Sequence, residues 1–424
     1  MTNSDALTTY PSHPHALLQN FATAGTVAVA LLFLTYWPTY SYLVLGGQSP
    51  LYYYMLPGFV ALPLLFLQPA TAGRLLNEPV VWWFATYVVL GMAWLLLSQD
   101  FPDVAAQQWR TRVLACFFFC TILVSSSLSR HRLVALAAAA CLVIACALSW
   151  FDVLFPSRLV PLGFQGANPG RGAGLFINAN GAAAFVLMAT IAILPYAPMR
   201  ARAAVLLFCV LAVAPTFSRF GWIFSGLLIV MAIVLKLLDR RQVLVILLAI
   251  PLLLAGAGVY YEFMLQSGNE NLMGRLAWFQ TFGEQYDFSM RERAFVAQRA
   301  WERFLDSPLY GHGIGVTLAK GARVGTHNMY VLLMAEQGLI GLALYLSLLG
   351  ILAHKGLRLA RAAAARHSRE IGLTLLLYAA FLCAYGFVNH NVLDEPHGMF
   401  ILAFVVAAGF QAARLERAVQ KRRF

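Results

Sequence analysis

Two short polar segments border long apolar runs, and their residue types could carry out group transfer. His327 and Asn328 precede one such run, after a stretch that contains Gly321 and Gly325. A histidine titrates near neutral pH, so it can accept a proton from a hydroxyl group. An interfacial histidine that only makes hydrogen bonds is the structural alternative. His327 is the sequence's best candidate for proton transfer.

The second segment is Thr216-Phe-Ser-Arg219-Phe-Gly221-Trp, which separates two apolar runs with no real loop. The guanidinium of Arg219 therefore lies at the membrane surface or just below it. Arginine is energetically costly there unless it is paired or functional. The planar fork suits phosphate oxygens, particularly those of a lipid diphosphate. Snorkelling to lipid headgroups is the alternative. Arg275 follows Gly274 and precedes an aromatic cluster, so it either enters a cavity or forms a surface ion pair.

The elements that position these residues follow from composition. The chain has 424 residues, 60% of them hydrophobic and only 11% charged, whereas a soluble domain carries roughly 25% charged residues. Mean hydropathy is +0.71. These values predict an all-α polytopic membrane protein. They exclude disorder, collagen and coiled coil, and continuous apolar runs disfavour a β-barrel. The net charge of +12 is mostly a topology signal, so we expect no nucleic-acid partner.

We predict about twelve transmembrane helices in a single integral-membrane domain, 1–424, without a cleavable signal peptide. The predicted spans are 17–36, 51–68, 80–98, 110–128, 132–153, 177–196, 202–217, 220–238, 242–260, 327–351, 371–392 and 397–413. The six cysteines fall inside apolar runs, which favours buried packing residues over metal ligands.

Positive charge sets the predicted orientation. With both termini inside, 18 of the 30 Lys and Arg residues lie on the inner side, and the long 261–326 segment faces outward, which means the periplasm of a bacterium. Ser289 and Glu292 read as a capping box for a helix of about 290–305. Ala294, Ala297, Trp301 and Leu305 share one face of it. That face fits either the membrane surface or a cavity, and packing against neighbouring spans is equally possible.

Carboxylates offer little support for metal or ion chemistry. The close outward pairs are Asp100/Asp103 and Asp394/Glu395, and both look like helix ends, so we expect no metal and no cofactor. Glu336 lies inside a predicted span, and we read it as a packing and hydrogen-bonding residue. No P-loop, GxSxG or HExxH motif is present.

The residues around His327 resemble a known signature. Asp306-Ser-Pro308-Leu-Tyr-Gly311-His-Gly313 leads into His327-Asn328, nine residues, and Gly338-Leu-Ile-Gly341. This is similar to the His-Asn-x9-Gly-x-x-Gly signature of the O-antigen ligase and polymerase superfamily. Ser218-Arg219 at an outer helix edge and the block ending Asn178-Ala-Asn180-Gly181 also resemble the family. The resemblance covers about residues 160–400.

The resemblance implies a GT-C-like integral-membrane glycosyltransferase in the bacterial inner membrane, with a periplasmic active site. It implies an undecaprenyl diphosphate-linked glycan as donor and lipid A-core as acceptor, among membrane lipids. His327 takes the catalytic-base position and Arg219 and Arg275 the diphosphate positions; Arg293, and more loosely Asp394, also match. Asn328, Gly338 and Gly341 support the site.

Within the superfamily, O-antigen ligase is favoured over two relatives. Polymerases diverge more around the histidine motif, and protein O-oligosaccharyltransferases usually carry an added C-terminal domain. Two other classes stay open. A secondary transporter or flippase is expected to have mid-membrane acidic residues and an internal repeat. A non-catalytic lipid-binding scaffold would not need a histidine at an outer helix start.

Overall fold

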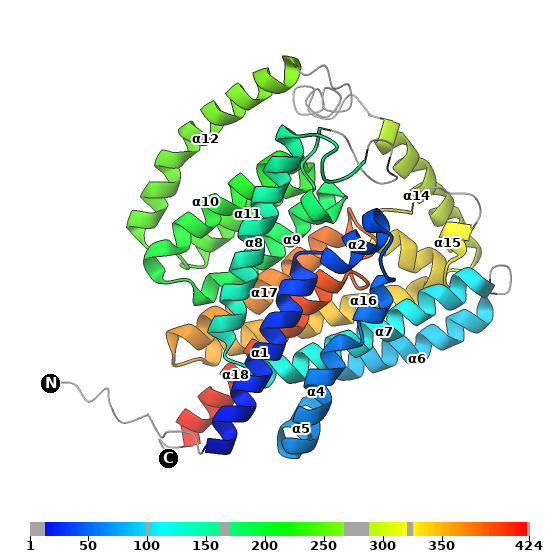
Figure 1. Ribbon diagram of the computed structural model, residues 1–424. Coiled ribbons are helices and arrows are strands. Elements are labelled where there is room, and N and C mark those ends of the chain that lie inside the picture. Colours follow the sequence, from blue (N-terminus) through cyan, green and yellow to red (C-terminus); the bar gives the residue numbers. More distant parts are fainter. Residues whose placement is uncertain are drawn as a thin grey trace.

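A computed structural model describes residues 13–98, 102–161, 164, 170–266, 288–319 and 325–421. Within these ranges the chain is helical, with no strand (Figure 1). The helices of the first half are α1 (His13–Leu34), α2 (Trp37–Leu45), α3 (Pro50–Tyr53), α4 (Leu56–Leu67), α5 (Pro69–Leu76), α6 (Pro79–Leu97), α7 (Pro102–Leu128), α8 (His131–Leu154), η1 (Gly174–Phe176), α9 (Ala179–Ile193), η2 (Leu194–Tyr196), η3 (Met199–Ala201) and α10 (Arg202–Val213).

The second half continues in the same way. Its helices are η4 (Ala214–Thr216), α11 (Arg219–Val234), α12 (Arg240–Gln266), α14 (Phe288–Asp306), α15 (Val316–Ala319), α16 (Met329–Ala362), α17 (Arg366–Gly386) and α18 (Pro396–Lys421). Ten helical segments among the described residues are long and apolar enough to cross a membrane. The prediction of an all-α polytopic membrane protein is confirmed.

The other two of the twelve predicted spans, 220–238 and 242–260, correspond to α11 and α12. Helix α11 is apolar but has only 16 residues, which is short against the roughly 20 that a bilayer needs. Helix α12 has 27 residues and begins with Arg240 and Arg241. It is not among the ten candidate spans, which were sought only in described residues.

The core lies around α9 and α18. Most of α9 is buried, and six of its 15 residues are alanine. Small side chains let membrane helices approach closely, because lipid supplies no hydrophobic drive for association. Helix α18 buries a continuous stretch from Pro396 to Phe410. Both helices begin next to the cavity described below, so the core holds their first turns in place.

The bundle has two distinct ends. Helix α1 begins and α18 ends at one of them, which we call the terminal end (Figure 1). Polar contacts join the predicted inner segments there: Lys355 pairs with Glu78, and Glu416 accepts from the backbone of Ala364 and Ala365. The starts of α9, α11, α16 and α18 lie at the opposite end, which we call the loop end. Segments predicted to share one side of the membrane therefore gather at one end of the bundle.

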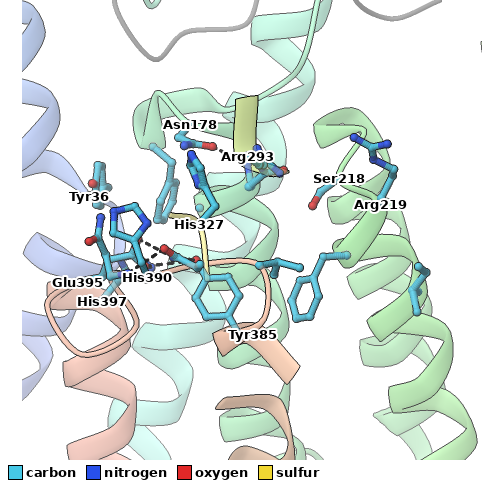
Figure 2. Close-up of a pocket in the computed structure, with 18 residues that line it drawn as sticks. Tyr36, Asn178, Ser218, Arg219, Arg293, His327, Tyr385, His390, Glu395 and His397 are labelled. Carbon is cyan, nitrogen blue, oxygen red and sulfur yellow. Dashed lines mark hydrogen bonds and ion pairs between the residues drawn. The ribbon is translucent and has the colours of Figure 1, made fainter. Parts of the chain in front are cut away.

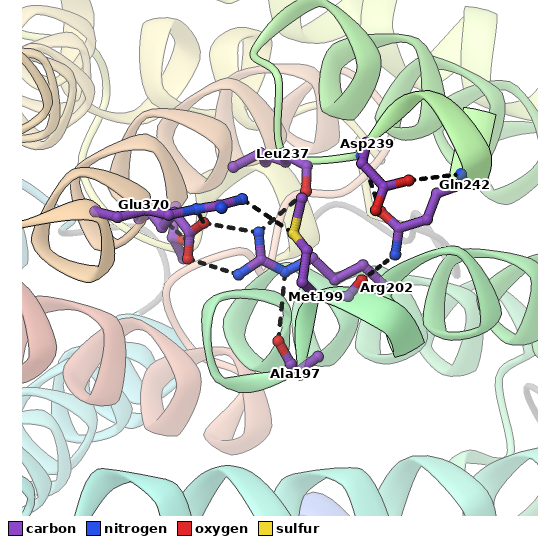
Figure 3. A network of polar contacts seen from close by, with 9 residues as sticks. Ala197, Met199, Arg202, Leu237, Asp239, Gln242 and Glu370 are labelled. Atoms are coloured by element: carbon purple, nitrogen blue, oxygen red, sulfur yellow. Dashed lines mark hydrogen bonds and ion pairs between the residues drawn. The ribbon is translucent and has the colours of Figure 1, made fainter. Parts of the chain in front are cut away.

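A buried ion pair ties two helices and one interhelical turn together at the terminal end (Figure 3). Arg202 donates from Nη1 and Nη2 to the two carboxylate oxygens of Glu370, at 2.8 and 2.6 Å. Arg202 also donates to the carbonyl of Leu237, and Arg366 donates to Glu370. Both members of the pair are buried. The bidentate geometry fixes α10 against α17 and the α11–α12 turn.

Helix α16 is broken at Gly338, where the backbone has φ of 64° and ψ of −160°. The amides of His312 and Gly313 donate to the freed carbonyls of Ala335 and Glu336, at 3.1 and 2.9 Å. A Cβ at position 338 would lie 2.3 Å from the Leu309 backbone. Glycine is therefore required there, both for the left-handed φ and for the close approach. The segment Gly311–Gly315 is a turn in which three glycines have positive φ values.

Helix α14 confirms the predicted helix of about 290–305. The predicted apolar face is partly open, since Trp301 and Leu305 are 46% and 60% exposed. Ala300 is buried, and α14 packs on α16. The side chains of Ser289 and Glu292, the predicted capping box, lie outside the described residues, as does Arg275.

Candidate active site

A cavity of about 510 Å³ opens at the loop end of the bundle. Four helices begin at its wall, and α14 contributes Arg293. Figure 2 shows His327 and Arg293 together and Ser218 and Arg219 on the separate α11 wall. The lining residues come from the starts of α9, α11, α16 and α18 and from the α17–α18 connection: Asn178, Asn180, Gly181, Ser218, Arg219, Phe220, Ile223, Arg293, His327, Tyr385, Val388, Asn389, His390, Asn391, Glu395 and His397, with Tyr36 and Phe176.

Three of these helix starts share one local design. Ile177, Phe217 and His327 have φ of 63°, 46° and 48°, and each immediately precedes an N-cap residue. The caps are Asn178, Ser218 and Asn328, whose side chains accept hydrogen bonds from first-turn amides. A positive φ costs a non-glycine residue about 1–3 kcal/mol. Such strain at a cavity wall is typical of sites where geometry is fixed for function.

The helix starts also give the cavity its electrostatic character. Helix N-termini carry partial positive charge and free amides, so they favour anions. Four of them meet here beside Arg219 and Arg293. The arrangement suits a ligand with several negative oxygens, such as a diphosphate.

Arg171 joins the starts of α9 and α11 to each other. Its Nε donates to the Thr216 carbonyl at 2.8 Å, and its Nη2 donates to Asn180 Oδ1 at 2.9 Å. The Arg171 side chain is buried, at 3% exposure. This bridge holds Asn180 and the turn that carries Arg219 at a fixed separation.

His327 lies near two groups that disfavour its charged form. Its ring centroid is 5.3 Å from that of His390, with the rings edge to face. Burial lowers the pKa of His327 to about 3, helped by the positive charge of Arg293 and by His390. Burial and Arg293 lower the pKa of His390 to about 4. Both imidazoles are therefore neutral at pH 7.

Another part of the cavity lining is acidic. Glu395 accepts from Asn389 Nδ2 at 3.2 Å and lies 3.3 Å from His397 Nε2. Burial raises the pKa of Glu395 to about 7, and Asp394 adds to the effect. Asp394, the looser sequence match, is not among the lining residues. The predicted helix-end role of the pair holds in part, because the Glu395 carbonyl accepts from Met399 in the first turn of α18.

Three of the predicted residues, Arg219, Arg293 and His327, line this one cavity. Asn328 caps α16 next to it, while Gly338 and Gly341 lie farther along α16, away from the lining. Glu336 is fully buried and accepts from Thr317 Oγ1 at 2.7 Å, with Arg112 at 3.8 Å. That agrees with a packing and hydrogen-bonding role.

Sequence reasoning undervalued the late part of the chain. His390 and His397 belong to no motif that sets them beside His327 in the sequence, yet both line the cavity with Glu395 and Asn389. Tyr36 and Tyr385 carry no sequence signal that separates them from other interfacial tyrosines. The available signal was Asn389-His-Asn391, a polar group at the outer end of a span. In the part of the chain that the structure describes, no group of three or more His, Cys, Asp or Glu has metal-binding spacing.

Comparison with known proteins adds one finding. The family model described as O-antigen ligase matches residues 203–346, which run from α10 through the first half of α16. The match includes Arg219, Arg293, His327 and Gly338. No curated protein matches the chain. The match supports a relationship to the O-antigen ligase/polymerase superfamily, and it covers about a third of the chain.

Proposed function

We propose that the protein is an O-antigen ligase of the bacterial inner membrane. It transfers polysaccharide from undecaprenyl diphosphate to a sugar hydroxyl of lipid A-core on the periplasmic face. The termini are cytoplasmic and the loop end is periplasmic. The observation that carries the proposal is that one cavity, at the starts of four helices, is lined by His327, Arg219 and Arg293.

In the proposed reaction the acceptor hydroxyl oxygen attacks the anomeric carbon of the donor. A new carbon–oxygen bond forms, and the bond from that carbon to the diphosphate oxygen breaks. The hydroxyl proton passes to a ring nitrogen of His327, and undecaprenyl diphosphate leaves with the electron pair. A single displacement inverts the anomeric centre.

The charge that develops on the diphosphate is stabilised by Arg219 and Arg293. Preorganised donors in a site that excludes water are worth more than the same donors in water. Helix-start amides add to this stabilisation at no cost of reorganisation. Arg275 is proposed for the same role from the resemblance alone. These groups supply without metal the charge that a cation often supplies.

The protonation state of His327 suits this role. Its low pKa keeps it neutral and able to accept a proton at pH 7. A bound diphosphate would offset the positive charge of Arg293, which now depresses that pKa. Donor binding would therefore raise the pKa of His327 and make it a stronger base when the donor is present.

The test is transfer by purified protein supplied with lipid-linked glycan and lipopolysaccharide core. Glycan attached to lipid A-core supports a ligase. A longer glycan that remains on the lipid carrier would identify a polymerase, and glycan on protein an oligosaccharyltransferase. Movement of lipid-linked glycan across proteoliposomes without a new bond would instead identify a transporter.

A further inference from the structure

A second cavity, of about 450 Å³, lies at the terminal end of the bundle. It is separate from the candidate active site, with which it shares no lining residue. The starts of α8 and α17, the η2 turn and the second half of α18 form its walls. Its lining residues are Arg130, His131, Arg132, Leu133, Tyr196, His367, Ser368, Ile371, Ala408, Gln411, Ala412 and Leu415.

One part of this cavity is cationic. Arg130 and Arg132 line it, and among the described residues neither makes a salt bridge to a carboxylate. Glu370, which precedes the lining residue Ile371 on α17, is already engaged by Arg202 and Arg366. Helices α8 and α17 both begin at the cavity, so their N-terminal partial charges add to those of the arginines.

His131, between the two arginines, lines the cavity but has both ring nitrogens engaged by the protein. His131 Nε2 lies 2.8 Å from the Ser126 carbonyl, and its Nδ1 lies 3.3 Å from the Tyr196 hydroxyl. A neutral ring satisfies both contacts, donating to the carbonyl and accepting from the hydroxyl. The positive charge offered to a ligand therefore comes from Arg130 and Arg132.

The other part of the cavity is apolar. Ile371, Ala408 and Ala412 form its inner surface, while Leu133 and Leu415 at its rim are 43% and 64% exposed. Large apolar side chains that are exposed on a membrane-spanning bundle face the lipid. A ligand that fits both parts needs a negatively charged head and a hydrocarbon tail.

We propose that this cavity binds the phosphodiester headgroup of an anionic phospholipid. Arg130 and Arg132 contact the phosphate, and an acyl chain leaves along Leu133 and Leu415 into the bilayer. Basic pockets between membrane helices commonly recognise anionic headgroups in this way. The bound lipid bridges α8, α17 and α18, and it does so independently of transfer chemistry at the loop end.

The test measures lipid binding by native mass spectrometry of the purified full-length protein. Phosphatidylglycerol and phosphatidylcholine with the same acyl chains are added separately. Each arginine near a headgroup contributes about 1 kcal/mol, which is about fivefold in affinity. Arg132→Gln should therefore weaken phosphatidylglycerol binding about fivefold, and the Arg130→Gln/Arg132→Gln double variant still more. Phosphatidylcholine binding should not change.

Arg417→Gln is the matched control, because Arg417 lies on α18 at the same end, is exposed and does not line the cavity. It should bind phosphatidylglycerol like the wild type. Equal loss in Arg417→Gln and Arg132→Gln would mean general surface attraction and would overturn the proposal. Displacement of the lipid by millimolar inorganic phosphate would also overturn it, since the site would then select phosphate alone. Unchanged binding of a polyprenyl diphosphate analogue by Arg132→Gln would separate this site from the donor site.

Discussion

Two arginine sites at opposite ends of the molecule use the guanidinium differently. At the terminal end, Arg202 contacts Glu370 and the Leu237 carbonyl, and the pair fixes α10 against α17 and the α11–α12 turn. At the loop end, Arg219 and Arg293 line a cavity with His327 and the starts of four helices. A buried guanidinium satisfied by a carboxylate holds structure, whereas one at a cavity wall can bind a ligand. The comparison predicts that substitutions at the Arg202 site lower stability, whereas substitutions at the cavity lower transfer or donor binding.

The largest expected effect is on turnover at the loop end. His327→Ala should lower the rate of glycan transfer by roughly 10²–10⁴-fold, because a general base contributes that much. Transfer by purified enzyme at saturating donor measures it. His312→Ala is the control, since His312 contacts the Arg303 carbonyl outside the cavity. Equal transfer by His327→Ala and wild type would remove His327 from the mechanism.

The next effect is on stability at the terminal end. Arg202→Ala should lower the free energy of unfolding by about 3–5 kcal/mol, because it leaves the buried carboxylate of Glu370 with less compensation. Thermal unfolding in detergent measures the loss. The double variant Arg202→Met/Glu370→Leu should recover much of it, with transfer per folded molecule retained. A double variant as unstable as Arg202→Ala would contradict the ion-pair account.

A smaller effect is expected on donor affinity. Arg219→Ala should weaken binding of a polyprenyl diphosphate analogue by about 1.5–3 kcal/mol, the contribution of a charged hydrogen bond. Arg219→Lys should recover only part of it, because a point charge cannot reproduce a bidentate fork. Titration of each purified variant measures the difference. Wild-type affinity in Arg219→Ala would reduce Arg219 to an interfacial anchor and turn attention to Arg275.

The pH dependence of stability tests whether His327 is neutral in the folded protein. Its pKa falls from 6.5 to about 3 on folding, so the unfolded chain binds more protons between these values. Its stabilising contribution is therefore complete above pH 6.5 and is lost as pH falls toward 3. Glu395 acts oppositely, since its raised pKa contributes stability that is lost as pH rises from 4.5 through about 7. The unfolding temperature of wild type should thus fall relative to that of His327→Gln as pH drops from 6.5 toward 3; a difference that stays constant with pH would contradict the assigned pKa.

The smallest expected effect concerns metal. Transfer should survive EDTA, because the proposed stabilisation of the diphosphate comes from arginines and helix starts. Loss of transfer that magnesium or manganese restores would overturn this expectation. It would direct attention to Asp100 and Asp103, and to Glu395 beside His397.

Much of the fold could be predicted from the sequence, because twenty-residue apolar runs leave few alternatives in a bilayer. The break at Gly338 could not, since hydropathy continues through it and the partner amides come from His312 and Gly313. Arg219 and His327 stood out because each interrupts an apolar pattern beside a helix start. The sequence pattern did not reveal the place of His390, Glu395 and His397 in the cavity. Their position depends on where α18 packs against α9, and a local sequence pattern carries no such tertiary information.

The central claim is that one cavity holds the donor and the base in separable roles. The most direct measurement takes one preparation of His327→Ala and determines both analogue binding and glycan transfer. We predict affinity within about threefold of wild type together with loss of transfer, because a base acts on the transition state and not on donor binding. Wild-type transfer, or donor affinity lost as completely as transfer, would contradict the claim.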